Sequence, residues 1–122
     1  MRNALGFIGG GLILLNSAMH SFVGWPAISS EVARTNAPAD LVAGLAASWH
    51  FGGAAMLIIG ITIVLQFVEV RRNPSASLRA TQVAGFVYLV FGVGVLALTR
   101  EAFAWFFIVP GLVLAAASWG RR

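Results

Sequence analysis

The chain has 122 residues, of which 59% are hydrophobic and only 10% are charged, and its formal net charge is +4. A domain in water carries about one quarter charged residues, so this composition excludes an ordinary water-soluble surface and indicates a lipid environment. The chain has no cysteine, which excludes disulfides, thiolate nucleophiles and Cys-ligated metal centres. All eight basic residues are arginines at the ends of apolar segments, which indicates membrane electrostatics and not nucleic-acid binding.

Four apolar segments are each long enough to cross a bilayer. They cover residues 4–25, 41–68, 78–99 and 102–120. The first is expected to end at Pro26, and the last is interrupted only by Pro110. Because lipid offers no partner to an unpaired backbone group, segments of this kind must be helical. The sequence predicts an all-α integral membrane four-helix bundle that forms a single transmembrane domain, residues 1–122.

Short connections at residues 71–77 and at Arg100–Glu101 predict antiparallel, up-down neighbours. The arginines divide unequally between the two sides of such a bundle. One side carries Arg2, Arg71, Arg72, Arg79, Arg121 and Arg122, and the other carries Arg34 and Arg100. The positive-inside rule then predicts a multi-pass protein of the bacterial inner membrane with both termini in the cytoplasm.

Small residues recur at helical spacing on the first two segments. We expect close packing at Gly6, Gly10, Gly44, Ser48, Gly52 and Gly60. Helices in lipid associate where small residues let their backbones approach, so these stripes suit contacts within the bundle or with a partner. Besides lipid, the expected partners are further copies of the chain or other membrane subunits.

Two histidines fall within the apolar segments, at positions 20 and 50. Counting at 1.5 Å per residue from the predicted helix ends places both about 8–14 Å below the outer interface. Small, polar and aromatic residues surround them. The candidate cofactor-binding residues are His20, His50, Asn16, Gly24, Trp49 and Gly53.

Several interpretations of these histidines stay open. Each ring is expected to hydrogen-bond across helices, or both are axial ligands of a b-type haem. A third interpretation is a metal ion, although two imidazoles alone would leave it short of ligands. The remaining interpretations are proton relay and contact with a quinone. Pro110 lies near the same depth and frees the carbonyl of Phe106. Tyr88, near the middle of the membrane, needs a partner such as Asn16 or a carbonyl.

No catalytic or phosphate-binding motif is present, so an enzyme is not expected. The leading interpretation is a non-catalytic structural or accessory subunit of an oligomer or a larger membrane complex. One alternative is an electron-transfer protein that binds haem through His20 and His50. Another is a small transporter, although the two halves of the chain show no convincing inverted repeat.

Several features occur together: His20-x-x-x-Gly24, an "EVAR" turn, Trp49 followed by glycine, an arginine-rich connection and the final segment "FAWFFIVPGLVLAA". Together they resemble a family of small bacterial four-helix membrane proteins of unknown function, the DUF6463-like proteins. His50 departs from the pattern, where an aromatic residue is more usual. The resemblance implies a fold and a location, and no activity.

Overall fold

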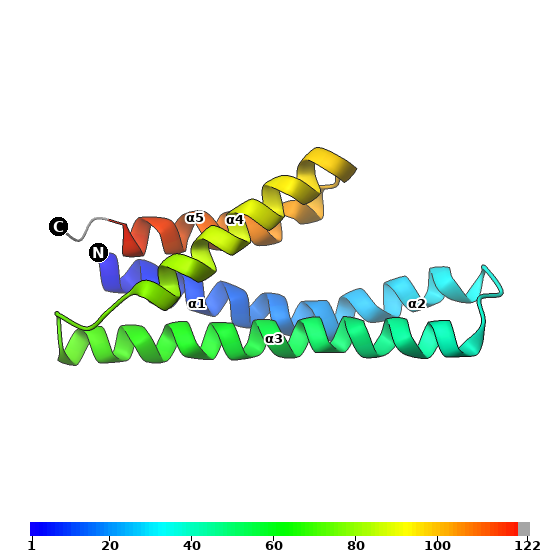
Figure 1. Ribbon diagram of the computed structural model, residues 1–122, viewed down its shortest axis with the longest axis horizontal. Coiled ribbons are helices and arrows are strands. Elements are labelled where there is room, and N and C mark those ends of the chain that lie inside the picture. The colour runs from blue at the N-terminus through cyan, green and yellow to red at the C-terminus, as the bar shows by residue number, and fades with distance from the viewer. Residues whose placement is uncertain (120–122) are drawn as a thin grey trace.

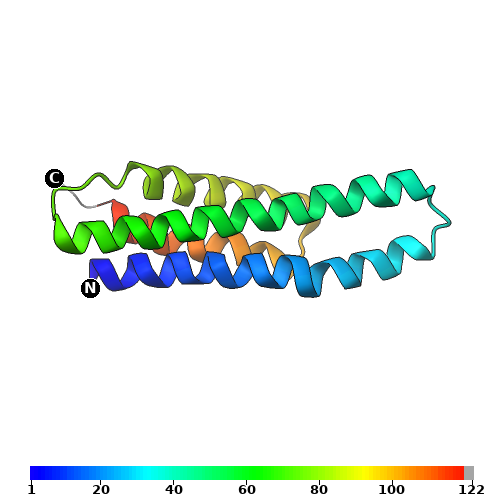
Figure 2. The same cartoon turned by 90° about the horizontal axis from the view of Figure 1, so that it is seen from below.

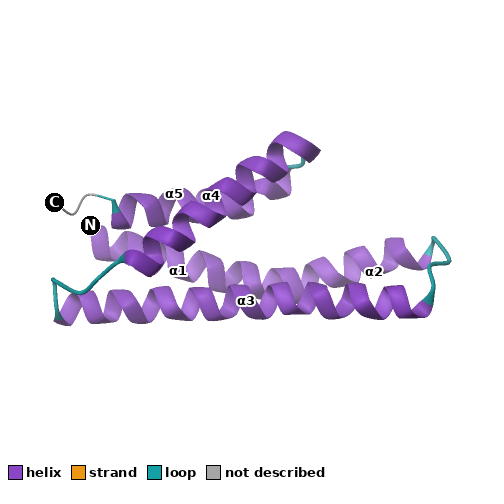
Figure 3. Cartoon of the chain, in the orientation of Figure 1, coloured by secondary structure: helices purple, strands orange, loops and turns teal. Residues whose placement is uncertain are grey.

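The computed structural model describes residues 1–119, and its regular elements are all helical (Figures 1 and 3). The elements are α1 (Arg2–Met19), a π-helical turn η1 (His20–Gly24), α2 (Trp25–Ala33), α3 (Ala39–Arg72), α4 (Arg79–Thr99), a 3₁₀ turn η2 (Ala102–Ala104) and α5 (Trp105–Ser118). Helix makes up 87% of the described residues, which contain no strand. The predicted all-α class is therefore confirmed.

Three helical segments are long and apolar enough to cross a membrane. They are Arg2–Ala33, Ala39–Arg72 and Arg79–Thr99. The fourth segment, Ala102–Ser118, is apolar but shorter, about 25 Å at 1.5 Å per residue. At the end of the predicted span 102–120, Trp119 lies in a turn after the helix and Gly120 lies outside the described residues.

The prediction that the first helix ends at Pro26 is wrong, because the helix continues to Ala33. The π-helical turn explains how it continues. The backbone N–H of Trp25 donates to the carbonyl of His20, five residues back, instead of four. Proline has no N–H and its ring crowds the preceding turn, so a wider turn just before Pro26 accommodates it. The connection between the predicted spans 4–25 and 41–68 thus shrinks to residues 34–38, where Asn36 turns the chain with a φ of 52°.

The helices form two hairpins of unequal length. The long hairpin consists of α1–η1–α2 and α3, and the short hairpin consists of α4 and α5, with α5 packed along α1. The N-terminus, the α3–α4 connection and the last turn of α5 lie at one end, which we call the arginine end (Figure 2). Towards the other end the short hairpin leans away from the long one, which continues past its tip (Figures 1 and 2).

The hydrophobic core lies in the half of the molecule next to the arginine end, which we call the arginine half. Ile13, Phe67 and Leu114 are fully buried there. A methyl group on Gly6 would lie 2.3 Å from the Phe67 ring, and one on Gly60 would lie 3.2 Å from the Gly10 carbonyl oxygen. The backbones of α1 and α3 therefore meet where only glycine fits.

The short hairpin has a similar crossing, since a methyl group on Gly111 would lie 3.1 Å from the Gly85 carbonyl oxygen. The other predicted packing positions lie elsewhere. Gly52 faces the ring of His20, whereas Gly44 has open space around it and Ser48 is exposed.

Polar side chains tie the helix ends together in the arginine half. The side-chain oxygen of Gln66, on α3, accepts from the backbone N–H and the hydroxyl of Thr81 in the first turn of α4. Its amide nitrogen donates to the carbonyl of Ser77 at 2.7 Å, and Gln82 donates to the carbonyl of Ser118 at 3.2 Å. These bonds satisfy backbone groups that helix ends leave without partners.

Candidate functional site

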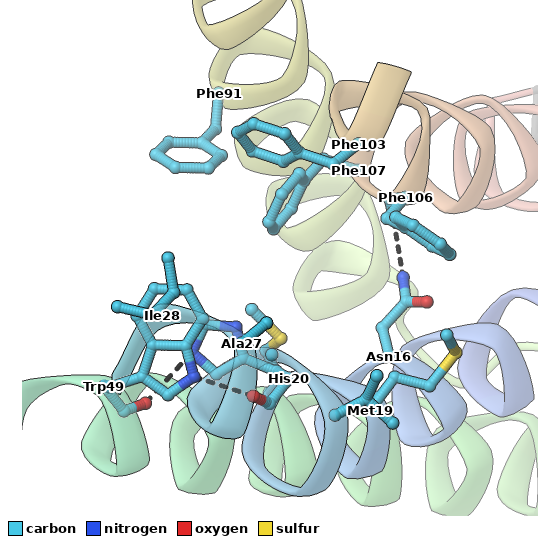
Figure 4. A pocket seen from close by; sticks show the side chains of 13 residues that line it. Asn16, Met19, His20, Ala27, Ile28, Trp49, Phe91, Phe103, Phe106 and Phe107 are labelled. Atoms are coloured by element: carbon cyan, nitrogen blue, oxygen red, sulfur yellow. Dashed lines mark hydrogen bonds between the residues drawn. The ribbon is translucent and has the colours of Figure 1, made fainter. Parts of the chain in front are cut away.

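A cavity of about 520 Å³ separates the two hairpins in the other half of the molecule, which we call the cavity half. One wall comes from α1, η1 and α2, with Trp49 and Met56 of α3. The facing wall belongs to the short hairpin, and its aromatic residues are Phe91, Phe103, Phe106 and Phe107 (Figure 4). The lining is almost wholly apolar, and its most polar members are Asn16, His20 and the indole of Trp49.

His20 and Trp49 form a reciprocal pair at this cavity. The indole Nε1 of Trp49 donates to the carbonyl of His20 at 2.7 Å, and Nε2 of His20 lies 3.0 Å from the carbonyl oxygen of Trp49. The rings stack with centroids 4.3 Å apart and planes within 2° of parallel. A carbonyl oxygen only accepts, so Nε2 of His20 carries a hydrogen. The pair therefore links η1 to α3 within the long hairpin.

Local backbone geometry and small neighbours position this pair. The carbonyl of His20 opens the π-helical turn, so it accepts from Trp25 as well as from the Trp49 indole. A methyl group on Gly24 would lie 3.0 Å from the Trp49 ring, and one on Gly52 would lie 3.2 Å from Nε2 of His20. The glycines beside the histidine therefore make room for the His20–Trp49 stack.

Asn16 fastens the long hairpin to the short one at the base of the cavity. Its side-chain nitrogen donates to the carbonyl of Phe106 (Figure 4). Phe106 lies four residues before Pro110, which has no N–H to offer that carbonyl. The Phe106 carbonyl, which the sequence predicts to be free, thus accepts a hydrogen bond from α1. An unpaired carbonyl in an apolar interior costs several kcal/mol, so this bond holds α1 and α5 together.

His50 lies apart from this arrangement. Its side chain is exposed, its ring centroid lies 5.7 Å from that of Trp25, and it lines a second groove together with Gly53. Ser17 donates to the carbonyl of Gly53 at 2.8 Å on that side. The structure brings together Asn16, His20, Gly24 and Trp49, and it places Gly53 and His50 at the other groove.

Haem ligation by both histidines remains a prediction, and it has a structural cost. Iron coordination through Nε2 of His20 would break that atom's contact with Trp49, and His50 would have to turn from its own groove. Among residues 1–119 no group of three or more His, Asp or Glu side chains lies close enough to hold a metal ion.

Some lining residues were missed by sequence reasoning. Met19, Ile28, Met56 and Phe103 line the cavity, and each looks like an ordinary lipid-facing residue in the sequence. The expected partner of Tyr88 is also wrong, because its buried hydroxyl has no hydrogen-bond partner among the described residues. Asn16 is already engaged with Phe106, which explains why it does not serve Tyr88.

Comparison with known proteins gives no match for this chain among family models, curated proteins or solved structures. The site must therefore be interpreted from its own geometry.

Proposed function

We propose that this chain is a four-span protein of the bacterial inner membrane, with antiparallel neighbouring helices and both termini in the cytoplasm. Within the membrane it acts as a non-catalytic accessory subunit that holds an apolar molecule in the cavity between its hairpins. The resemblance to DUF6463-like proteins agrees with this location and leaves the bound molecule open.

Helix lengths support the membrane placement. From Arg2 to His20, from Arg79 to Thr99 and from Arg71 back to Trp49 the helices rise about 27, 30 and 33 Å at 1.5 Å per residue. The hydrocarbon core of a bilayer is about 30 Å thick. A bilayer whose inner boundary lies at the arginine end therefore has its outer boundary near the His20–Trp49 pair. The cavity then opens close to the outer surface, at a shallower depth than predicted from the sequence.

The cavity is the observation that carries the proposed activity. Its volume of about 520 Å³ lies within the range of small-molecule sites, about 300–1,000 Å³. Such sites combine an apolar lining with a few fixed polar groups. Asn16 and His20 meet that description because hydrogen bonds to Phe106 and Trp49 hold them in place.

The accessory role rests on the outward face of α4. Val83, Phe86, Val87 and Val90 are all exposed there, so α4 offers lipid or another subunit an unbroken apolar surface.

Mass spectrometry of the purified protein tests this proposal. The wild-type chain is extracted from bacterial membranes in mild detergent, and the apolar molecules that co-purify are identified and counted per chain. Ala27→Phe places a ring in the cavity, and Ala97→Phe makes the same change at an exposed alanine of α4 outside the lining. We expect one molecule to be enriched in the wild type and the control, and reduced at least about fivefold in Ala27→Phe. Identical lipid profiles in all three proteins would contradict the proposal.

A further inference from the structure

Asn16, a lining residue of the cavity, has one polar side-chain atom without a partner among the described residues. Because the carbonyl of Phe106 only accepts, the nitrogen of the Asn16 amide must face it, which fixes the orientation of the amide. The side-chain oxygen of Asn16 then has no hydrogen-bond partner within residues 1–119, and it is not fully buried. That oxygen is an acceptor.

His20 leaves a second free atom by the same reasoning. Nε2 carries the hydrogen that faces the Trp49 carbonyl, and in the tautomer with its hydrogen on Nε2 the Nδ1 atom is the acceptor. The His20 side chain makes no other hydrogen bond within the described part of the chain, and its Nδ1 atom is not fully buried. The unpaired side-chain atoms of these two lining residues therefore accept hydrogen bonds and donate none.

The two residues are neighbours. Positions four apart on a helix lie on one face with Cβ atoms about 5–6 Å from each other, and both residues line the same cavity. Opposite them stand the aromatic rings of the short hairpin, including Phe103 and Phe107 (Figure 4). A molecule in this space meets aromatic rings along its body and the Nδ1 acceptor of His20 at one side.

We infer that the cavity selects an apolar molecule by its hydroxyl group, which donates its one hydrogen to Nδ1 of His20. This inference rests on the proposed function and specifies the chemistry of its ligand. A carbonyl or an ether oxygen at the same place would meet this acceptor with another acceptor and leave both unpaired. Quinols and prenyl alcohols both present a hydroxyl on an apolar body, whereas the corresponding quinones and ethers do not.

Matched probe pairs test the inference. The purified chain in lipid nanodiscs is titrated with a decyl-substituted benzoquinol under anaerobic conditions and with its quinone, and separately with farnesol and farnesyl methyl ether. Affinities are measured by equilibrium dialysis. We expect the hydroxyl member of at least one pair to bind about tenfold more tightly than its partner, as one hydrogen bond in an apolar site provides. The pair that shows the preference distinguishes a quinol from a prenyl alcohol as the source of the hydroxyl.

Two variants separate recognition from folding. His20→Phe keeps an aromatic ring stacked on Trp49 but removes Nδ1, so the preference for the hydroxyl member is lost while ether or quinone affinity is retained. Trp105→Phe makes an aromatic substitution at an exposed residue outside the cavity lining, so the preference persists. Equal affinities within both pairs, or tighter binding of quinone and ether, would overturn the inference. Failure of all four probes to bind would instead count against the proposed cavity function.

Discussion

In the arginine half, Gly10 and Gly60 let α1 and α3 touch at the level of the backbone, and Phe67 fills the space above Gly6. Farther along the same helix, α1 and the short hairpin are separated by a cavity of about 520 Å³. Where α1 packs on α3, the two halves use glycine differently. In the arginine half it brings backbones together, and in the cavity half Gly24 and Gly52 make room for the His20–Trp49 stack.

The difference shows how one small bundle combines rigidity with an open site. Apolar burial does not drive helices together in lipid, so close packing and hydrogen bonds must supply the association energy. The arginine half concentrates both, through its glycine crossings and through Gln66 and Gln82. The cavity half depends on a few hydrogen bonds from Asn16, Ser17 and the His20–Trp49 pair. The site is therefore held open by the packing at the other end.

The largest expected effect comes from adding bulk to the arginine half. Gly60→Val drives a side chain into Leu14 and the Gly10 backbone, so we expect the free energy of unfolding to fall by about 3 kcal/mol. Gly44→Val, on the same helix but with open space around it, should change that free energy by less than about 0.5 kcal/mol. Reversible unfolding in mixed micelles measures both. Equal losses for the two variants would break the contrast between the halves.

The bond between Asn16 and Phe106 should show a strong coupling to Pro110. Asn16→Leu leaves the Phe106 carbonyl without a donor, and we expect a loss of about 2 kcal/mol in the free energy of unfolding. Pro110→Ala restores an N–H four residues after Phe106, so the same Asn16→Leu change should cost less than half as much in that background. A double-mutant cycle measures the coupling, and additive effects would show that Asn16 does not serve the proline-freed carbonyl.

A smaller effect is expected at the His20–Trp49 pair. Trp49→Phe keeps an aromatic ring but removes the bond to the His20 carbonyl, which should lower the free energy of unfolding by about 1 kcal/mol. Trp105→Phe is the matched control, because Trp105 is exposed. It should cost less than about 0.5 kcal/mol in the same unfolding experiment. Equal costs would mean that the pair contributes little to joining α1 and α3.

The smallest effect should have the opposite sign. The Tyr88 hydroxyl is buried in the core without a hydrogen-bond partner among the described residues. Tyr88→Phe therefore removes a polar group whose loss of hydration no hydrogen bond offsets. We expect the free energy of unfolding to rise by about 0.5 kcal/mol. A loss of stability would reveal a partner for this hydroxyl, and would place a polar contact inside the otherwise apolar core.

Much of the helical fold was predictable because membrane-length apolar runs leave the backbone no other choice. The freed carbonyl of Phe106 was also predictable, since it follows from the position of Pro110 alone. The continuation through Pro26 was not, because a π-helical turn is a local adjustment that composition does not reveal. That turn sets the direction of the His20 carbonyl towards Trp49. The cavity was equally hidden, since it arises from the divergence of two hairpins and not from any one segment.

The most direct test of the occupied cavity uses the methionines. The chain has three methionines, and the two beyond Met1, Met19 and Met56, both line the cavity. Cells grown with photo-methionine therefore carry diazirine groups in its walls, and irradiation of their membranes followed by peptide mass spectrometry reports what lies there. A Val87→Met variant adds a reference probe on the exposed face of α4. We predict adducts of one discrete apolar molecule at Met19 or Met56, distinct from the bulk phospholipids captured at position 87. The same phospholipid mixture at all three positions would contradict the account.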